Sequence, residues 1–277
     1  MISNVIHLGL DVALVFGLGW GVVGAALATS LSHWVTLTIL GGMVIAKGHL
    51  RLDDLLRVPA WRDVAPMLRS GVLLSTRSIL AMSMLMWATK LIAAFGAVSL
   101  AAHEVIRIIW VMSNQAFTSL DIATQSLVAF YLGRGDRRNA AGVYNRTLRL
   151  AVSIGVAVTA ALLLNASALP AVFSRDPAVV AAVAGVLPLI AMLMPLDAAA
   201  SVMDGVLLGA QESAWLSRTM VMTASCCAAG LLLCQRAGWG ILSIWFVIKF
   251  LTIGRLFGNS WRLRSRDGPL ATPAAAA

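Results

Sequence analysis

The chain has 277 residues, of which 60% are hydrophobic and 12% are charged, and its mean hydropathy is +0.87. Soluble domains carry about 25% charged residues, so this composition excludes a soluble enzyme and favours a polytopic α-helical membrane protein. The net charge of +9 fits cations gathered on the cytoplasmic side of a membrane protein, and no nucleic-acid partner is expected. The three cysteines lie in one apolar stretch without a metal-ligand spacing, so no metal is expected.

Eight apolar segments have lengths that suit, or nearly suit, a bilayer span. Turn signals such as Gly133-Arg134-Gly135-Asp136 separate most of them. Pro188 and Pro195 predict a bend in the sixth. The predicted spans are residues 2–16, 20–46, 70–95, 98–132, 140–165, 178–210, 214–235 and 238–258.

Cations are distributed unevenly between the two ends of these spans. With eight spans, fourteen Lys and Arg residues fall on one side, and only Arg175 and Arg236 fall on the other. The positive-inside rule therefore predicts that both termini are cytoplasmic. Residues 47–69 mix charged and apolar side chains and are predicted to form an amphipathic cytoplasmic linker, and residues 263–277 are predicted to be a disordered tail.

A short internal repeat indicates a duplicated architecture. Gly19-Trp20-Gly21 recurs as Gly238-Trp239-Gly240, 219 residues later, and each run opens the last span before a polar segment. The six predicted spans after the linker form one block, and the same offset places the start of its counterpart about 150 residues before Met1. We therefore expect that the four front spans of a twelve-span protein are missing from this chain.

Three runs carry a resemblance to a known family. They are the run from Leu10 to Thr29, the run Ala101-Ala102-His103-Glu104-Val105, and the run that begins with Asp204-Gly205. In this order they resemble the fifth-to-sixth span junction, the start of the eighth span and a tenth-span motif of multidrug and toxic compound extrusion (MATE) transporters, with a leaning toward the DinF-like branch.

The resemblance implies two six-helix lobes that face each other across a central cavity. Residues 1–46 would be the last two spans of the N-lobe, and residues 70–262 would be a complete C-lobe. It also implies export of organic or xenobiotic compounds by antiport of H⁺ or Na⁺, with no catalysis and no cofactor. The location implied is multi-pass, in a plasma membrane or a plastid envelope.

Ionisable residues inside the spans are the candidates for coupling, because charge in a membrane is costly. Asp197 and Asp204 lie two helical turns apart on one face, and we predict that they bind the coupling cation. A structural alternative pairs them with Arg77 or Lys90. The resemblance adds Asp11, the counterpart of a fifth-span acid.

Further residues suit the wall of a cavity for an amphipathic or cationic small molecule, which together with the lipid bilayer is the expected partner. The predicted lining is Asp121, Gln125, Asn114, Arg77, Lys90 and Trp87. Asp121, Gln125, Asn114 and Gln115 form a polar stripe along the fourth span, and hydrogen bonding between helices is an equally good interpretation of this stripe. Trp110 and Phe117 are further aromatic candidates for stacking on a cation.

Other charged residues have simpler interpretations. Glu104 and Arg107 are three residues apart and are predicted to pair on a helix surface. Arg255 is expected to reach the cytoplasmic surface with its long side chain, and the four-carbon stem of Lys249 could also reach an interface.

Two functions other than transport stay open at this point. One is a non-transporting half-transporter or membrane scaffold. The other is a lipid-linked flippase of the same superfamily, whose cavity should be more cationic. An enzyme is not expected, because the spans contain neither a His-rich metal box nor a Gly-x-Ser-x-Gly motif.

Overall fold

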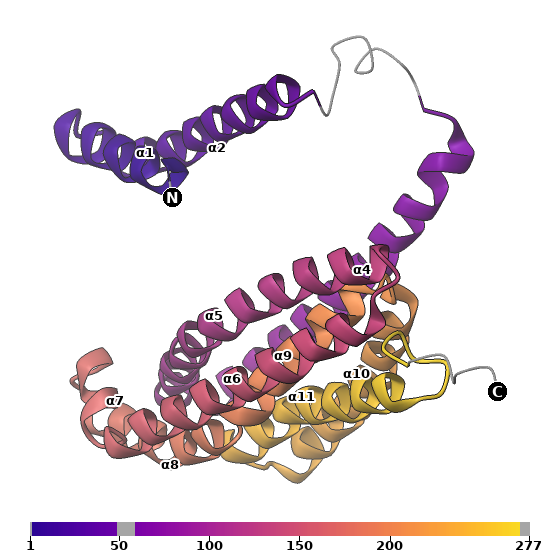
Figure 1. Ribbon diagram of the computed structural model, residues 1–277. Helices are drawn as coiled ribbons and strands as arrows, with labels where there is room; N and C mark the ends of the chain where they lie inside the picture. The colour runs from indigo at the N-terminus through magenta and orange to yellow at the C-terminus, as the bar shows by residue number, and fades with distance from the viewer. Residues whose placement is uncertain (1, 49–58, 272–277) are drawn as a thin grey trace. The chain divides into compact units, whose positions relative to one another are not determined.

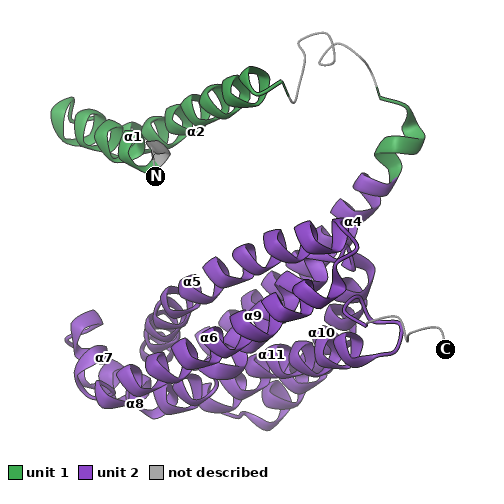
Figure 2. Ribbon diagram, viewed as in Figure 1, with its two compact units in different colours: residues 1–65 green, residues 66–277 purple. Residues whose placement is uncertain are grey.

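The computed structural model describes residues 2–48 and 59–271, and throughout these ranges the regular structure is helical, without a strand. This confirms the predicted all-α fold. The chain divides into two compact units, Met1–Ala65 and Pro66–Ala277, which Figure 2 distinguishes by colour.

The first unit contains a helical hairpin. Helix α1 (Ile2–Asp11) continues directly into a π-helical turn, η1 (Val12–Gly17), and α2 (Gly21–Ala46) packs against both (Figure 1). The crossing is close at Gly24, where an added Cβ would lie 2.9 Å from the carbonyl oxygen of Leu14. A π-helical turn inside a helix is often found at a functional site.

The second unit is a helical bundle built around α9. Eleven of the sixteen residues of α9 are buried, because α5, α6 and α11 pack around it. Helices α4 and α11, which lie before and after α9 in the sequence, contribute basic residues that bind its acids. The helices are α4 (Trp61–Ala93), α5 (Ala97–Gly133), α6 (Arg137–Leu164), α7 (Ala168–Phe173), α8 (Pro177–Met192), α9 (Met194–Gly209), α10 (Ser213–Ala237) and α11 (Ile241–Arg264).

Helices cover all eight predicted spans, and the protein is a multi-pass membrane protein. By length and hydropathy alone, five of the described helices could cross a bilayer, or six if α8 and α9 are one bent span. The hairpin helix at residues 4–17 is shorter than a bilayer needs. Helix α5 is long, but His103, Glu104 and Arg107 interrupt its apolar sequence.

The predicted bend is confirmed at Pro195 and absent at Pro188. Helices α8 and α9 meet at an angle of 48°, and Pro195 lies in the first turn of α9, where its missing N–H is tolerated. The carbonyl of Ala191, four residues earlier, accepts a hydrogen bond of 2.6 Å from the hydroxyl of Thr159 on α6. Pro188 lies within α8 without breaking it.

Two predicted segments differ from expectation at their boundaries. Residues 61–69, which were assigned to the linker, form the first turns of α4, and residues 49–58 lie outside the described residues. The predicted disordered tail is ordered through Ala271, whose carbonyl accepts a hydrogen bond of 2.8 Å from Arg137. The reason is that residues 265–271 form hydrogen-bonded turns that return to the bundle. Residues 272–277 lie outside the described part.

Helix α9 approaches α5 closely at two glycines. A Cβ added at Gly205 would lie 2.5 Å from the carbonyl oxygen of Asp121, and one added at Gly209 would lie 2.6 Å from that of Gln125. Real Cβ atoms do not come this close to backbone oxygens, so the two helices can pack at this distance only because both residues lack a side chain.

We expect Gly205→Ala to lower the free energy of unfolding by about 1–3 kcal/mol, because the methyl group would push α5 and α9 apart. The measurement is thermal unfolding of the purified protein. Gly142→Ala on α6 is the matched control, since no atom lies within 4 Å of its added Cβ, and helix propensity favours that change by up to about 1 kcal/mol. Equal effects of the two changes would contradict the close packing.

Candidate functional site

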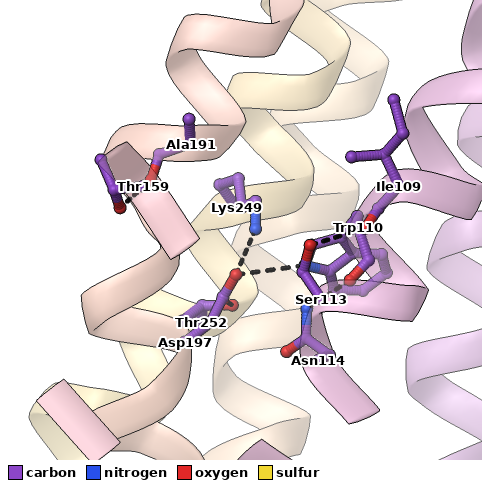
Figure 3. Close-up of polar contacts among 9 residues, drawn as sticks. All are labelled: Ile109, Trp110, Ser113, Asn114, Thr159, Ala191, Asp197, Lys249 and Thr252. Atoms are coloured by element: carbon purple, nitrogen blue, oxygen red, sulfur yellow. Dashed lines mark hydrogen bonds and ion pairs between the residues drawn. The ribbon is translucent and has the colours of Figure 1, made fainter. Parts of the chain in front are cut away.

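A buried ion pair joins α9 to α11. The ammonium of Lys249 lies 2.5 Å from Oδ2 of Asp197, and both side chains are at most 3% exposed. The hydroxyl of Thr252 donates to Oδ1 at 2.7 Å, and the indole N–H of Trp110 on α5 donates to Oδ2 at 3.1 Å. Figure 3 shows this arrangement. We call Asp197, Lys249, Thr252 and Trp110 the Asp197 cluster.

A second carboxylate lies two turns further along α9. Oδ2 of Asp204 forms ion pairs with two guanidinium groups, those of Arg77 on α4 and Arg255 on α11. The amide of Asn259 donates to Oδ1 at 2.7 Å. The carboxylate is 2% exposed, whereas the two arginine side chains are 20% and 26% exposed. We call Asp204, Arg77, Arg255 and Asn259 the Asp204 cluster.

The two clusters are built alike. In each, α9 supplies the acid, and α11 supplies one base for Oδ2 and one neutral donor for Oδ1. They differ in charge: the Asp197 cluster is balanced, and the Asp204 cluster has one positive charge in excess when all its groups are ionised. The excess lies on arginine side chains that are partly exposed.

Asp121 on α5 is the acid that lies beside the Asp204 cluster. It interacts electrostatically with Asp204, Arg77 and Arg255. Its oxygen Oδ1 is buried and accepts no hydrogen bond within the described part of the chain. The structure thus brings together three of the sequence-predicted residues, namely Asp204, Arg77 and Asp121.

The other predicted cavity residues have surroundings of their own. Lys90 is exposed in the last turn of α4, and Trp87 is partly buried against the core. Gln125 lines a cavity of about 430 Å³ between α4, α5, α9 and the start of α10. Asn114 donates to the carbonyl of Trp110 on its own helix at 2.8 Å.

Two aromatic candidates are occupied by the protein itself. Phe117 is completely buried in the core. Trp110 donates its N–H to Asp197, and its ring centroid lies 4.9 Å from the ammonium of Lys249, so the cation on this indole is part of the chain.

The predicted Glu104–Arg107 surface pair is confirmed, with a distance of 2.5 Å and side chains 40% and 37% exposed. The expectation that Lys249 and Arg255 reach an interface is wrong. Both turn toward the aspartates of α9, because these provide charge partners inside the bundle.

Asp11 lies in the first unit, at the last position of α1, and its neighbour is His7. The imidazole Nε2 of His7 lies 3.5 Å from Oδ2 of Asp11 and 3.1 Å from the hydroxyl of Thr29. Thr29 donates its own proton to the carbonyl of Ala25 at 2.9 Å. His7 therefore places an imidazole, which can carry a proton, at a position where a sodium site would need a further oxygen ligand.

Thr252 and Asn259 were not identified from the sequence. A signal was available, because Thr252 and Asn259 are separated by seven residues, as are Asp197 and Asp204. Two polar stripes with the same spacing on different spans indicate helices that face each other in register.

Comparisons with known proteins agree with this fold. The MatE family model matches residues 74–234. Protein DETOXIFICATION 44, chloroplastic, of Arabidopsis thaliana is 28% identical over 268 residues, which cover 96% of this chain and 50% of that protein. The probable multidrug resistance protein NorM of Thermotoga maritima is 28% identical over 184 residues, covering 65% of this chain and 39% of that protein.

Solved structures are similar in fold. The crystal structure of MATE in the bent conformation superposes with a TM-score of 0.79 at 18% identity, and the match covers 94% of this chain and 58% of that chain.

A second sequence relative, Protein DETOXIFICATION 43 of Arabidopsis thaliana, is 26% identical and is also matched over 50% of its length. The chain therefore spans about half the length of the curated relatives that it matches.

Proposed function

Because this chain belongs to the MatE family, which consists of transporters and not of enzymes, we propose that it acts in the export of organic or xenobiotic compounds by cation antiport. The observation that carries the proposal is the pair of buried aspartates on α9, each held by basic side chains from other helices. Ionisable groups inside a membrane protein mark ion and proton pathways.

We infer that the coupling ion is a proton. Oδ2 of Asp197 is already bound by Lys249, and Oδ1 by Thr252. A hard cation such as Na⁺ requires several oxygen ligands, and it would have to displace the ammonium group. A proton requires one lone pair, and its uptake by the carboxylate weakens the hold on the base. The His7–Asp11 neighbourhood in the first unit also favours a proton.

The proposed substrate is a small amphipathic or cationic molecule. Support comes from Asp121 and Gln125, which offer polar groups on α5, and from the partly buried ring of Trp87 on α4. The Asp204 cluster is positively charged by itself, so a cationic substrate would bind beside it only while Asp121 is ionised. Substrate binding and proton binding would then compete for the same carboxylates, which is the requirement for antiport.

The experiment measures transport by the full-length protein that contains these residues, after its reconstitution into lipid vesicles. A fluorescent organic cation should leave the vesicles when a pH gradient is imposed, and a Na⁺ gradient of equal size should not replace it. Transport driven by Na⁺ alone would contradict the proton as coupling ion. Absence of transport under both gradients would favour the non-transporting membrane scaffold.

A further inference from the structure

Three buried polar atoms in or beside the Asp204 cluster lack hydrogen-bond partners within the described residues: Oδ1 of Asn259, Oδ1 of Asp121 on α5 and Nε of Arg255 on α11. The last two belong to different helices. One is an acceptor and the other is a donor, and the two side chains interact electrostatically. A buried polar group without a partner costs about 1–3 kcal/mol, so each of the two atoms would gain from meeting the other.

Helix α9 packs directly against one side of Asp121. Its Oδ1 lies against Gly205, where an added Cβ would be only 2.6 Å away. The charged groups that interact with it come from three helices: Arg77 on α4, Asp204 on α9 and Arg255 on α11. Both guanidinium groups bind Asp204 instead, although an ionised Asp121 would also attract them.

We propose that Asp121 is the exchangeable proton site of the second unit, and that the described arrangement is its protonated state. When the proton leaves to water, the Asp121 carboxylate draws Arg255 away from Asp204 through the guanidinium Nε. Arg255 thereby moves between an acid on α9 and an acid on α5. The charge of the group Asp121, Asp204, Arg77 and Arg255 changes from +1 to 0.

The exchange couples proton binding to helix contacts. While Asp121 is protonated, both arginines tie α4 and α11 to α9. After proton release, α11 is tied to α5 and only Arg77 remains on Asp204. This role rests on the proposed proton-driven transport for its function, but proton binding by Asp121 can be tested without transport.

The test is infrared spectroscopy of the full translated product in lipid vesicles, with the carbonyl stretch of protonated carboxylic acids as readout. The wild-type protein should show this band at mildly acidic pH and lose it as the pH is raised. Asp121→Asn should remove the band, and Asp121→Glu should shift its frequency, which keeps the test valid if the asparagine variant folds poorly. A band that survives in Asp121→Asn, or no band in the wild type, would overturn the inference.

Two further variants separate the parts of the proposal. Asp136→Asn is the control: Asp136 is exposed, hydrogen bonds from Asn139 lower its pKa, and asparagine also caps a helix, so the band should be unchanged. Arg255→Met should make the Asp121 band persist to higher pH, because the ionised carboxylate loses its partner. An unaltered titration in Arg255→Met would refute the exchange of Arg255. A wild-type band without gradient-driven transport would overturn the proposed function and leave the proton site standing.

Discussion

Replacing Asp197 with leucine is expected to lower the free energy of unfolding by about 3–5 kcal/mol, because it leaves the ammonium of Lys249 buried without its counter-charge. The lysine side chain is only 1% exposed, so water cannot solvate it in place of the carboxylate. Lys249→Met should be similarly destabilising, because it leaves Asp197 with two neutral donors and no base. Thermal unfolding of the purified protein measures both effects.

The double variant Asp197→Leu/Lys249→Met should be much more stable than either single variant. Replacing a buried ion pair by apolar side chains of similar volume is often neutral, and a double-mutant cycle isolates the coupling between the two sites. The surface pair Glu104 and Arg107 provides the control, since Glu104→Gln should cost less than about 1 kcal/mol. Additive losses in the Asp197/Lys249 cycle would mean that the two residues do not stabilise each other.

Asp204→Asn is expected to abolish transport driven by a pH gradient. The amide keeps the shape of the carboxyl group, but it is neutral at every pH, so it cannot hold Arg77 and exchange Arg255 during a cycle. The measurement is efflux of a fluorescent cation from vesicles, together with the melting temperature. Efflux at the wild-type rate would disprove a coupling role for Asp204.

Loss of transport could also arise from a damaged fold, so a second comparison is needed. In Asp204→Asn/Arg77→Met the uncompensated guanidinium of α4 is gone, and stability should recover while transport stays absent. If transport returns together with stability, Asp204 has a structural role only. Glu212→Gln is the control for a carboxylate that also binds an arginine, Arg262, at 2.5 Å but lies at the end of the bundle.

The fold could be predicted from the sequence because each span is encoded locally. Apolar segments of bilayer length stand between turn signals, and the bend at Pro195 follows from the missing N–H of proline. The Glu104–Arg107 pair was predictable for the same reason, since both partners lie on one helix three residues apart.

The partners of Asp197 and Asp204 depend on packing between distant segments. Lys249 and Arg255 lie 52 and 51 residues after the acids that they bind. When each span is considered alone, the long side chains of Lys249 and Arg255 are sufficiently explained by their ability to reach a membrane interface. Arg77 could be predicted as a partner because few basic residues lie inside the spans. Its pairing with Asp204 and not with Asp197 depends on how α4 crosses α9.

The separation of Asp197 from Lys249 also constrains how the protein is made. A ribosome adds about 5–20 residues per second, so the 52 residues between them correspond to a delay of about 3–10 s. During that interval α9 has been synthesised with its acids, and α11 has not. Helix α9 therefore cannot reach its final environment in the bilayer on its own, because the basic partners of its two acids arrive only with the later helix α11.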